Sequence, residues 1–381
     1  MTGTKDERRT KGTGTVYQSS SGKWVAQATL QGKRKAISCA TKREAETKLR
    51  EMLSDADKGI ILASGKAKVG EWLTEWIETK PKLRPETRKS YALIIRVHLA
   101  PALGHIKLSD LQRAHLRSLY GELAAKGLKA STIHRIHAIV SSALQDALDD
   151  DLIPRNIARG MELDSIERDE MQTLDPQQVR TLLDAASGSH YHALLTLAIY
   201  SGMRIGELLA LQWGDVDFER GMVRVNRSLT RSKTFGEPKS AKSKRTISLP
   251  PACMDVLRAH RVEQIKERLK WGDQWQDNNL AFCTMQAGNC KSAQTLPGSP
   301  LTARVVTRAF ESLLERAGLP KVRFHDLRHT AATLMLLSGV PIKVASARLG
   351  HSTSALTMDV YSHVLPEMDR EAADKVGRLL A

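Results

Sequence analysis

The chain has 381 residues, 41% of them hydrophobic and 26% charged, which is ordinary for a globular protein of two or three domains. A formal net charge of +16 favours a polyanionic partner, nucleic acid before an acidic membrane surface. No apolar run approaches the roughly 20 residues that cross a bilayer. There is also no signal-peptide h-region and no CxxC pair among the four cysteines, so we expect a protein of the reducing cytosol.

The first 60 residues predict a basic DNA-binding domain. Residues 1–50 hold twelve Lys/Arg and four Asp/Glu, a local net charge of +8, which is half of the whole charge. A solubilising basic tail is the alternative. Three β-like runs are expected, at Thr15–Gln18, Trp24–Leu30 and Lys35–Ser38. A helix follows, with Thr41 as N-cap and Glu44 completing a capping box. A basic β-ribbon can lie in a major groove, and the candidate contacts are Lys23, Lys33, Arg34 and Lys35.

Residues 61–165 predict an all-helical domain after a linker. Apolar residues recur at helical spacing, as in the stretch Val69–Trp76, and Pro85 is typical of a helix start. The apolar stripes indicate a core. Basic residues such as Arg88 and Lys89 lie on the polar faces, where they contact either DNA or only solvent.

Residues 170–381 predict a third, mainly helical region with a short β section. Asp175 before Pro176 is typical of an N-cap followed by proline at the first helical position. Strands are expected at Met222–Leu229 and Thr246–Leu249, and helices resume to the end. The predicted fold class is therefore a multidomain α+β protein.

The stretch YSGMRIGELLALQW suggests phosphate binding. Gly202 interrupts the chain and leaves Arg204 at a helix N-terminus, where backbone N–H groups favour an anion. The guanidinium is a planar fork that matches two phosphate oxygens. The alternative is an ordinary surface pair between Arg204 and Glu207.

The turn KSAKSKRTISLP carries four basic residues that suit DNA. A lysine here either contacts a phosphate or reaches a groove and donates a proton. The residues are Lys239, Lys242, Lys244 and Arg245.

The stretch RFHDLRHTAATLML places His325 and Arg328 three residues apart, on one helix face. His325 and His329 also imitate a zinc motif, with Asp326 in place of glutamate. A neighbouring arginine would repel the metal, so a phosphate is the preferred ligand and no metal is expected.

The stretch LGHSTSALTMDVYSHV follows a predicted helix that ends at Leu349, with Gly350 as C-cap. His351 comes next and Tyr361 ten residues later. Taken in order, the motifs SGMRIGELLAL, a basic hairpin, HDLRHTAATL and LGH…Y resemble the tyrosine recombinase (phage integrase) family. The resemblance covers the whole chain, loosely at the N-terminus, where it is similar to lambda-type integrases.

The resemblance implies an arm-type DNA-binding domain in 1–60, a core-binding domain in 61–165 and a catalytic domain in 170–381. It implies Tyr361 as a nucleophile that forms a 3′-phosphotyrosyl ester without ATP, metal or other cofactor. The remaining catalytic residues would be Arg204, Lys239 (or Lys242), His325, Arg328 and His351. A homotetramer on double-stranded arm-type and core-type sites is implied, together with a DNA-bending host factor and a directionality factor. A basic DNA-binding regulator, a metal-dependent transposase and a type IB-like topoisomerase are the alternatives.

Overall fold

The computed structural model divides the chain into two compact units, Met1–Arg168 and Asp169–Ala381, which are described separately. The structure describes residues 14–30, 33–57, 67–166, 172–230, 232, 234–236, 244–286, 288–290, 293–350, 377–378 and 380. Among these residues, no helix combines the length and the apolar character that crossing a bilayer requires.

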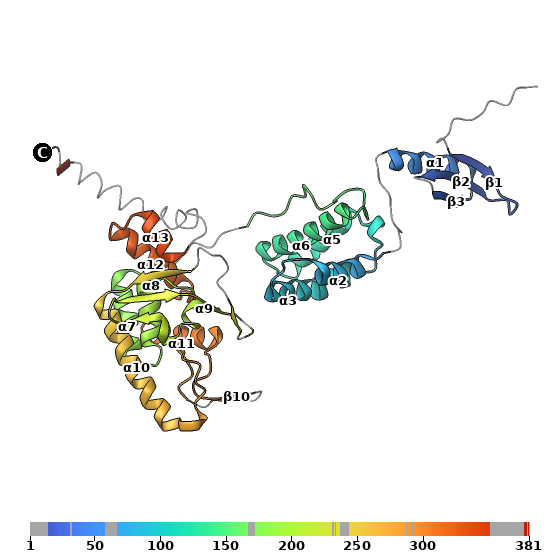
Figure 1. Cartoon of the computed structure of the whole chain (residues 1–381). Helices are drawn as coiled ribbons and strands as arrows, with labels where there is room; N and C mark the ends of the chain where they lie inside the picture. Colours follow the sequence, from blue (N-terminus) through green and yellow to red (C-terminus); the bar gives the residue numbers. More distant parts are fainter. Residues whose placement is uncertain are drawn as a thin grey trace, which may run out of the picture. The chain divides into compact units, whose positions relative to one another are not determined.

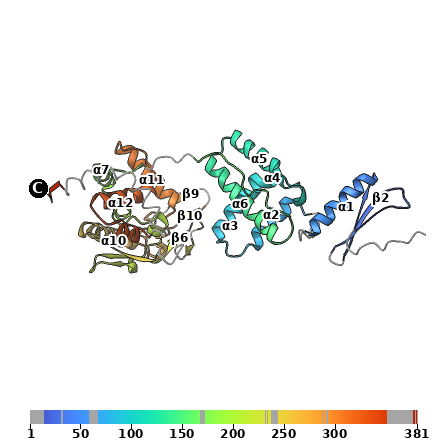
Figure 2. The same cartoon turned by 90° about the horizontal axis from the view of Figure 1, so that it is seen from above.

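The N-terminal part of the first unit is a small sheet with one helix. Its strands are antiparallel in the order β1 (Thr15–Gln18), β2 (Trp24–Leu30) and β3 (Lys33–Cys39). Helix α1 (Lys42–Asp57) packs beside the sheet (Figure 2), over a core that includes Ala26, Cys39 and Ala45. Thr41 Oγ1 accepts the Glu44 N–H at 3.3 Å, so the predicted cap is confirmed. The third strand begins two residues earlier than expected.

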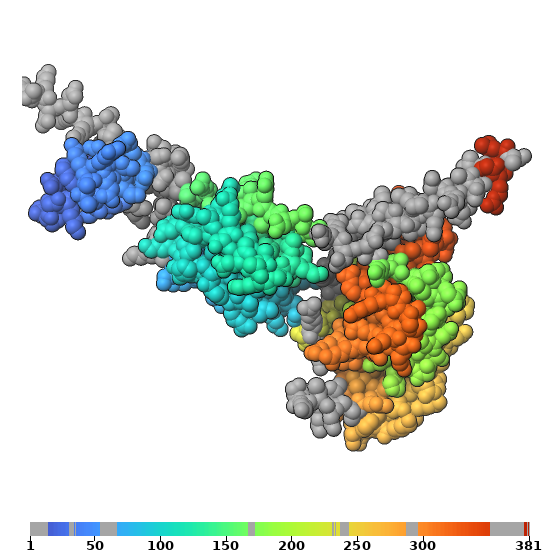
Figure 3. Space-filling model, turned by 180° about the vertical axis from the view of Figure 1, so that it is seen from behind, coloured from blue at the N-terminus to red at the C-terminus, as the bar shows by residue number. Residues whose placement is uncertain are grey.

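The rest of the first unit is helical, as its apolar spacing predicts. The helices are α2 (Val69–Thr79), α3 (Pro85–Ile94), α4 (Ala100–Leu103), α5 (Arg113–Ala125) and α6 (Ala130–Asp149), with a π-helix Ile95–Leu99 and a 3₁₀ turn Leu108–Asp110. They share one apolar core, and their side chains form a closely packed body in Figure 3, coloured light blue to green. The indole of Trp72 donates to Ala143 O at 3.0 Å, which ties α2 to α6.

The second unit is built around one buried helix. Its helices are α7 (Pro176–Ala186), α8 (His192–Ser201), α9 (Ile205–Leu208), α10 (Pro251–Trp271), α11 (Ala303–Arg316), α12 (Asp326–Leu337) and α13 (Ile342–Leu349), with 3₁₀ turns at Trp213–Asp215 and Gly272–Gln274. Residues Ala193–Ile199 are all buried, as expected of a helix that is apolar on every side. Helices α7, α10 and α12 contact α8 (Figure 1). The predicted cap at Asp175 is confirmed, since its Oδ1 accepts the Gln178 N–H at 2.8 Å.

Among the described residues, the strands of the second unit form three small sheets. One sheet has the order β4 (Val216–Asp217), β5 (Met222–Val225) and β8 (Arg245–Ser248); the two-stranded sheets pair β6 (Ser228–Leu229) with β7 (Phe235–Gly236) and β9 (Gly288–Cys290) with β10 (Ala293–Thr295).

The single strand expected at Met222–Leu229 is interrupted. At the break, Asn226 Nδ2 donates to Asp215 Oδ1 at 3.0 Å, and Arg227 Nη2 lies 3.5 Å from the same oxygen. These side-chain bonds hold the chain where it leaves β5 and enters the β6–β7 hairpin. The protein is thus helix-rich α+β with small sheets, as expected.

Candidate active site

Arg204 lies at the start of α9, just after α8 ends at Gly202. Its backbone N–H donates to Glu207 Oε2 at 3.0 Å, and its Nη1 donates to Glu207 Oε1 at 2.9 Å. The Glu207 side chain is only 3% exposed, whereas that of Arg204 is 37% exposed. The pair is therefore no ordinary surface pair: a buried carboxylate holds a guanidinium that still reaches solvent.

Arg328, in the first turn of α12, is buried. Its Nη1 donates to Gly202 O and its Nη2 to Leu349 O, both at 2.7 Å. Burial, followed by the positive charge of Arg204, lowers the pKa of Arg328 to about 9. The guanidinium therefore stays protonated at neutral pH.

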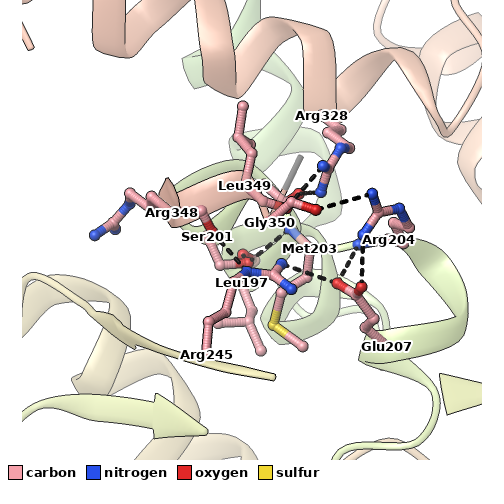
Figure 4. Close-up of polar contacts among 11 residues, drawn as sticks. Leu197, Ser201, Met203, Arg204, Glu207, Arg245, Arg328, Arg348, Leu349 and Gly350 are labelled. Carbon is pink, nitrogen blue, oxygen red and sulfur yellow. Dashed lines mark hydrogen bonds and ion pairs between the residues drawn. The ribbon is translucent and has the colours of Figure 1, made fainter. Parts of the chain in front are cut away.

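Three arginines converge on the C-terminal end of α13 (Figure 4). The carbonyl of Arg348 accepts from Arg245 Nε at 2.7 Å, that of Leu349 accepts from Arg328, and that of Gly350 accepts from Arg204 Nη2 at 3.3 Å. The last carbonyls of a helix lack intrahelical donors and carry the negative end of its dipole. They therefore suit positive side chains, and three successive carbonyls hold three separate guanidiniums here.

Glu207 links two of these arginines. While Arg204 binds Oε1, Arg245 Nη2 donates to Oε2 at 2.9 Å. Burial alone would raise the pKa of Glu207, but the hydrogen bond and charge of Arg245, with those of Arg204, outweigh it and lower the pKa. The carboxylate is consequently ionised at neutral pH, and its negative charge offsets part of the positive cluster.

His325 immediately precedes α12; part of the residue is exposed to solvent and the rest is covered by protein. Partial burial of the ring lowers its pKa, and the charges of His329, Arg328 and Arg204 act in the same direction. The imidazole is thus mostly neutral near pH 7 and able to accept a proton. The His325 and His329 rings lie edge to face, with centroids 5.4 Å apart. Among the described residues, no group of three His, Cys, Asp or Glu side chains is placed to hold a metal ion.

The other predicted site residues fall into three groups. Lys239, Lys242, His351 and Tyr361 lie outside the described residues. Lys33 and Lys35 lie in β3, with their side chains outside the described set. The remaining candidates with an exposed side chain are Lys23, Arg34, Lys89 and Lys244.

Two predicted DNA contacts, Arg88 and Arg245, bind backbone or buried acceptors of the protein itself. Arg88 donates to Ile77 O at 2.6 Å, to Glu78 O and to Lys80 O at 3.2 Å, so it caps the C-terminus of α2. The Arg245 side chain is 7% exposed and bound within the arginine cluster. The alternation of side chains along β8 could have indicated the burial of Arg245, because residues two apart share a face of the strand and Ile247 is fully buried.

The fold and this geometry bring two guanidiniums to the end of α13, and one of them, that of Arg204, still reaches solvent. Such a site suits an anionic group. The Phage integrase family model matches residues 172–368, more than half of the chain, and a model of the phage integrase N-terminal SAM-like domain matches residues 68–124. The chain belongs to the phage integrase family. It is accordingly a site-specific recombinase of the tyrosine type, which breaks and rejoins DNA.

Relatives agree with this membership, and solved structures share the fold. An integrase of Streptomyces ambofaciens is 32% identical over 381 residues, with 93% of each chain covered. A tyrosine recombinase XerC-like protein of Caldanaerobacter subterraneus is 27% identical over 91% of this chain and 92% of its own. The Tn1549 transposon integrase, solved with transposon right end DNA, superposes with a TM-score of 0.67 at 21% identity over 82% of this chain and all of its own. Lambda integrase, solved as a dimer on a COC′ core site, gives 0.59 at 18% identity over 93% and 96%.

Proposed function

We propose that the protein integrates and excises a mobile DNA element, and that Arg204 and Arg328 clamp the non-bridging oxygens of the scissile phosphate. The observation that carries this assignment is the convergence of both guanidiniums on adjacent carbonyls, Gly350 O and Leu349 O, directly before His351. Arginine forks match phosphate oxygens in geometry and charge. Cations fixed before the reaction stabilise the charge that develops in the transition state.

Tyr361 is the proposed nucleophile. Its Oη attacks the phosphorus, the bond to the 5′ oxygen breaks, and the strand is held as a 3′-phosphotyrosyl ester that keeps the bond energy for rejoining. His325 accepts the tyrosine proton, and its lowered pKa supports this role. Lys239, or else Lys242, gives a proton to the departing 5′ oxygen. His351 adds a hydrogen bond to a non-bridging oxygen, and no ATP or metal takes part.

Each of the three predicted domains has its own proposed role. Residues 1–60 bind arm-type sites, residues 61–165 bind core-type sites and residues 170–381 carry out catalysis. The concentration of positive charge in residues 1–50 supports the first assignment. Lambda integrase has been solved as a tetramer bound to a Holliday junction, with a TM-score of 0.56, and we propose a homotetramer on DNA here. A DNA-bending host factor and a directionality factor complete the assembly, in the cytoplasm of a bacterial host.

A covalent trapping experiment tests the chemistry. The full chain is incubated in EDTA with a library of nicked duplexes whose central sequence is randomised, and protein–DNA adducts that survive denaturant are isolated and sequenced. The nick lets the cleaved fragment diffuse away, so the tyrosyl ester accumulates. We expect adducts from the wild type and none from Tyr361→Phe. Tyr200→Phe is the matched control, because this exposed tyrosine lies in the same unit and its hydroxyl makes no hydrogen bond among the described residues.

The outcomes separate the candidate functions. An adduct on selected sequences, followed by strand joining to a second duplex, supports the recombinase. Sequence-independent relaxation of supercoiled plasmid would indicate a topoisomerase. Binding without any adduct would indicate a regulator, and strict dependence on Mg²⁺ would rule out the proposed chemistry.

A further inference from the structure

The turn that precedes His351 is held by a third arginine to which the catalytic scheme gives no role. We infer that Arg245 is a positioning residue that fixes Arg204, through Glu207, relative to the end of α13. This inference rests on the proposed function, since it concerns the same phosphate-binding site. It assigns Arg245 to the interior of the site in place of the DNA-facing surface of the hairpin.

The position of Arg245 in β8 lets its side chain reach several elements. It is the first residue of β8, which pairs with β5, and Val225 lies opposite it in the ladder. The side chain is 7% exposed, and among the described contacts its Nε donates to Arg348 O and its Nη2 to Glu207 Oε2. A planar guanidinium therefore bridges a strand, a helix end and a buried carboxylate at once.

The first consequence concerns Arg204. Its backbone and its Nη1 both bind Glu207, so the orientation of this carboxylate sets the orientation of the guanidinium. Without Arg245, Glu207 would lose one of the two cations that keep its pKa low inside the protein. Arg204 would then depend on a carboxylate that is less firmly oriented, and small displacements of a catalytic group are costly in rate.

The second consequence concerns the path of the chain into His351. Gly350 has φ +68°, a left-handed conformation that favours glycine. A Cβ on Gly350 would lie 3.0 Å from Arg245 Nη1 and 3.2 Å from its Cδ. Arg245 thus packs directly against the turn whose carbonyls also bind Arg204 and Arg328. One side chain therefore fixes both the arginine clamp and the point from which the chain continues to His351.

Lysine cannot reproduce this arrangement. It keeps the positive charge, but its donors radiate from one nitrogen on a flexible stem, whereas Arg245 donates from separate nitrogens of a rigid plane, Nε and Nη2 among them. Arg245→Lys therefore tests geometry at constant charge. Glu207→Gln breaks the link from the other side and leaves the bond from Arg245 to Arg348 O available. Arg268→Lys is the control, because Arg268 is an exposed arginine of the same unit that binds a carboxylate, Asp277 Oδ2, at 2.9 Å.

The experiment measures three quantities for each full-length variant. They are the melting temperature of the protein, its affinity for a nicked duplex selected in the trapping experiment, and the single-turnover rate of adduct formation on that duplex at saturating protein. For Arg245→Lys and Glu207→Gln we expect unchanged DNA affinity and a rate about 10²-fold lower. The double variant should be no slower than either single variant, because both changes break one chain of contacts. Arg268→Lys should match the wild type.

Three results would overturn the inference. If Arg245→Lys forms the adduct at the wild-type rate, Arg245 has no positioning role. The proposed function would still stand in that case, because the wild type forms the adduct. Weaker DNA binding with a normal rate at saturation would make Arg245 a DNA contact. Loss of the melting transition in both single variants would make the network purely structural. Absence of any adduct from the wild type would instead contradict the proposed function.

Discussion

Leu349 lies so close to Gly202 that a Cβ on the glycine would be 2.3 Å from Leu349 Cδ2. Gly202 ends α8 with φ +62°, and its carbonyl accepts a hydrogen bond from Arg328. Leu349 ends α13, and its carbonyl accepts from the same guanidinium. The contact between these two residues therefore sets the distance between Gly202 O and Leu349 O, the two acceptors that Arg328 bridges. It also explains why a glycine precedes the Met203–Arg204 pair.

Gly202→Ala should destabilise the second unit and slow adduct formation. The left-handed backbone alone costs an alanine about 1 kcal/mol, and the clash with Leu349 adds to this cost. Gly188→Ala is the matched control, since Gly188 has φ +75° but no atom within 4 Å of the added Cβ. Denaturant unfolding of both variants separates the two costs. Equal losses of unfolding free energy would contradict the packing argument.

The rate of adduct formation should depend on pH through His325. The pKa of His325 lies below its ordinary value of 6.5. The imidazole is therefore neutral and able to accept a proton until the pH falls below this lowered pKa. The rate should therefore stay level around neutrality and decline with an inflection below pH 6.5. His325→Asn should remove this acid limb and slow the reaction by about 10²-fold.

His329→Asn serves as the control for this pH profile. His329 is one of the charges that lower the pKa of His325, so its removal should keep the acid limb and move it upward toward pH 6.5. The measurement is a single-turnover rate across pH at constant ionic strength. An acid limb that persists unchanged in His325→Asn would assign the proton transfer to another group.

Arg88→Ala should change stability and Lys89→Ala should change DNA binding, although the two residues are adjacent. Arg88 caps the carbonyls at the end of α2, so its removal should cost about 1–2 kcal/mol of unfolding free energy with little change in DNA affinity. Lys89 is exposed and lies 3.6 Å from Glu86 Oε1. Its removal should leave stability unchanged and, if it contacts a phosphate, lower the salt slope of DNA binding by about one. The reverse pattern would restore Arg88 as a DNA contact.

Deletion of residues 1–60 should weaken binding to DNA that contains arm-type sites and flatten its dependence on salt. Each phosphate neutralised by residues 1–60 releases counterions, so each contact adds about 0.9 to the slope of log affinity against log salt concentration. Replacing the exposed Lys23 and Arg34 by glutamine in the full chain should give a smaller change in the same direction. Unchanged affinity and slope in the deletion would refute the arm-binding role.

Local chemistry in the sequence predicted several elements well. The caps at Thr41 and Asp175, the helix start at Pro85 and the left-handed Gly350 after α13 depend on residues within a few positions of one another. The strand expected at Met222–Leu229 was wrong in extent. Its interruption depends on bonds to Asp215, which lies in a separate turn and gives no signal within the β-like run itself.

The sequence by itself determined the family and the concentration of positive charge in residues 1–50, and it predicted Arg204, His325 and Arg328 as site residues, because residue type and spacing on one helix or turn are local properties. Only the tertiary structure decided that Arg204 and Arg328 meet at the end of α13 and that Glu207 is buried between Arg204 and Arg245. Arg245 looks like one more cation of a basic turn until strand pairing brings it to a helix end more than 100 residues away in sequence. The role of a guanidinium depends on which acceptors surround it, and packing, not residue order, sets those acceptors.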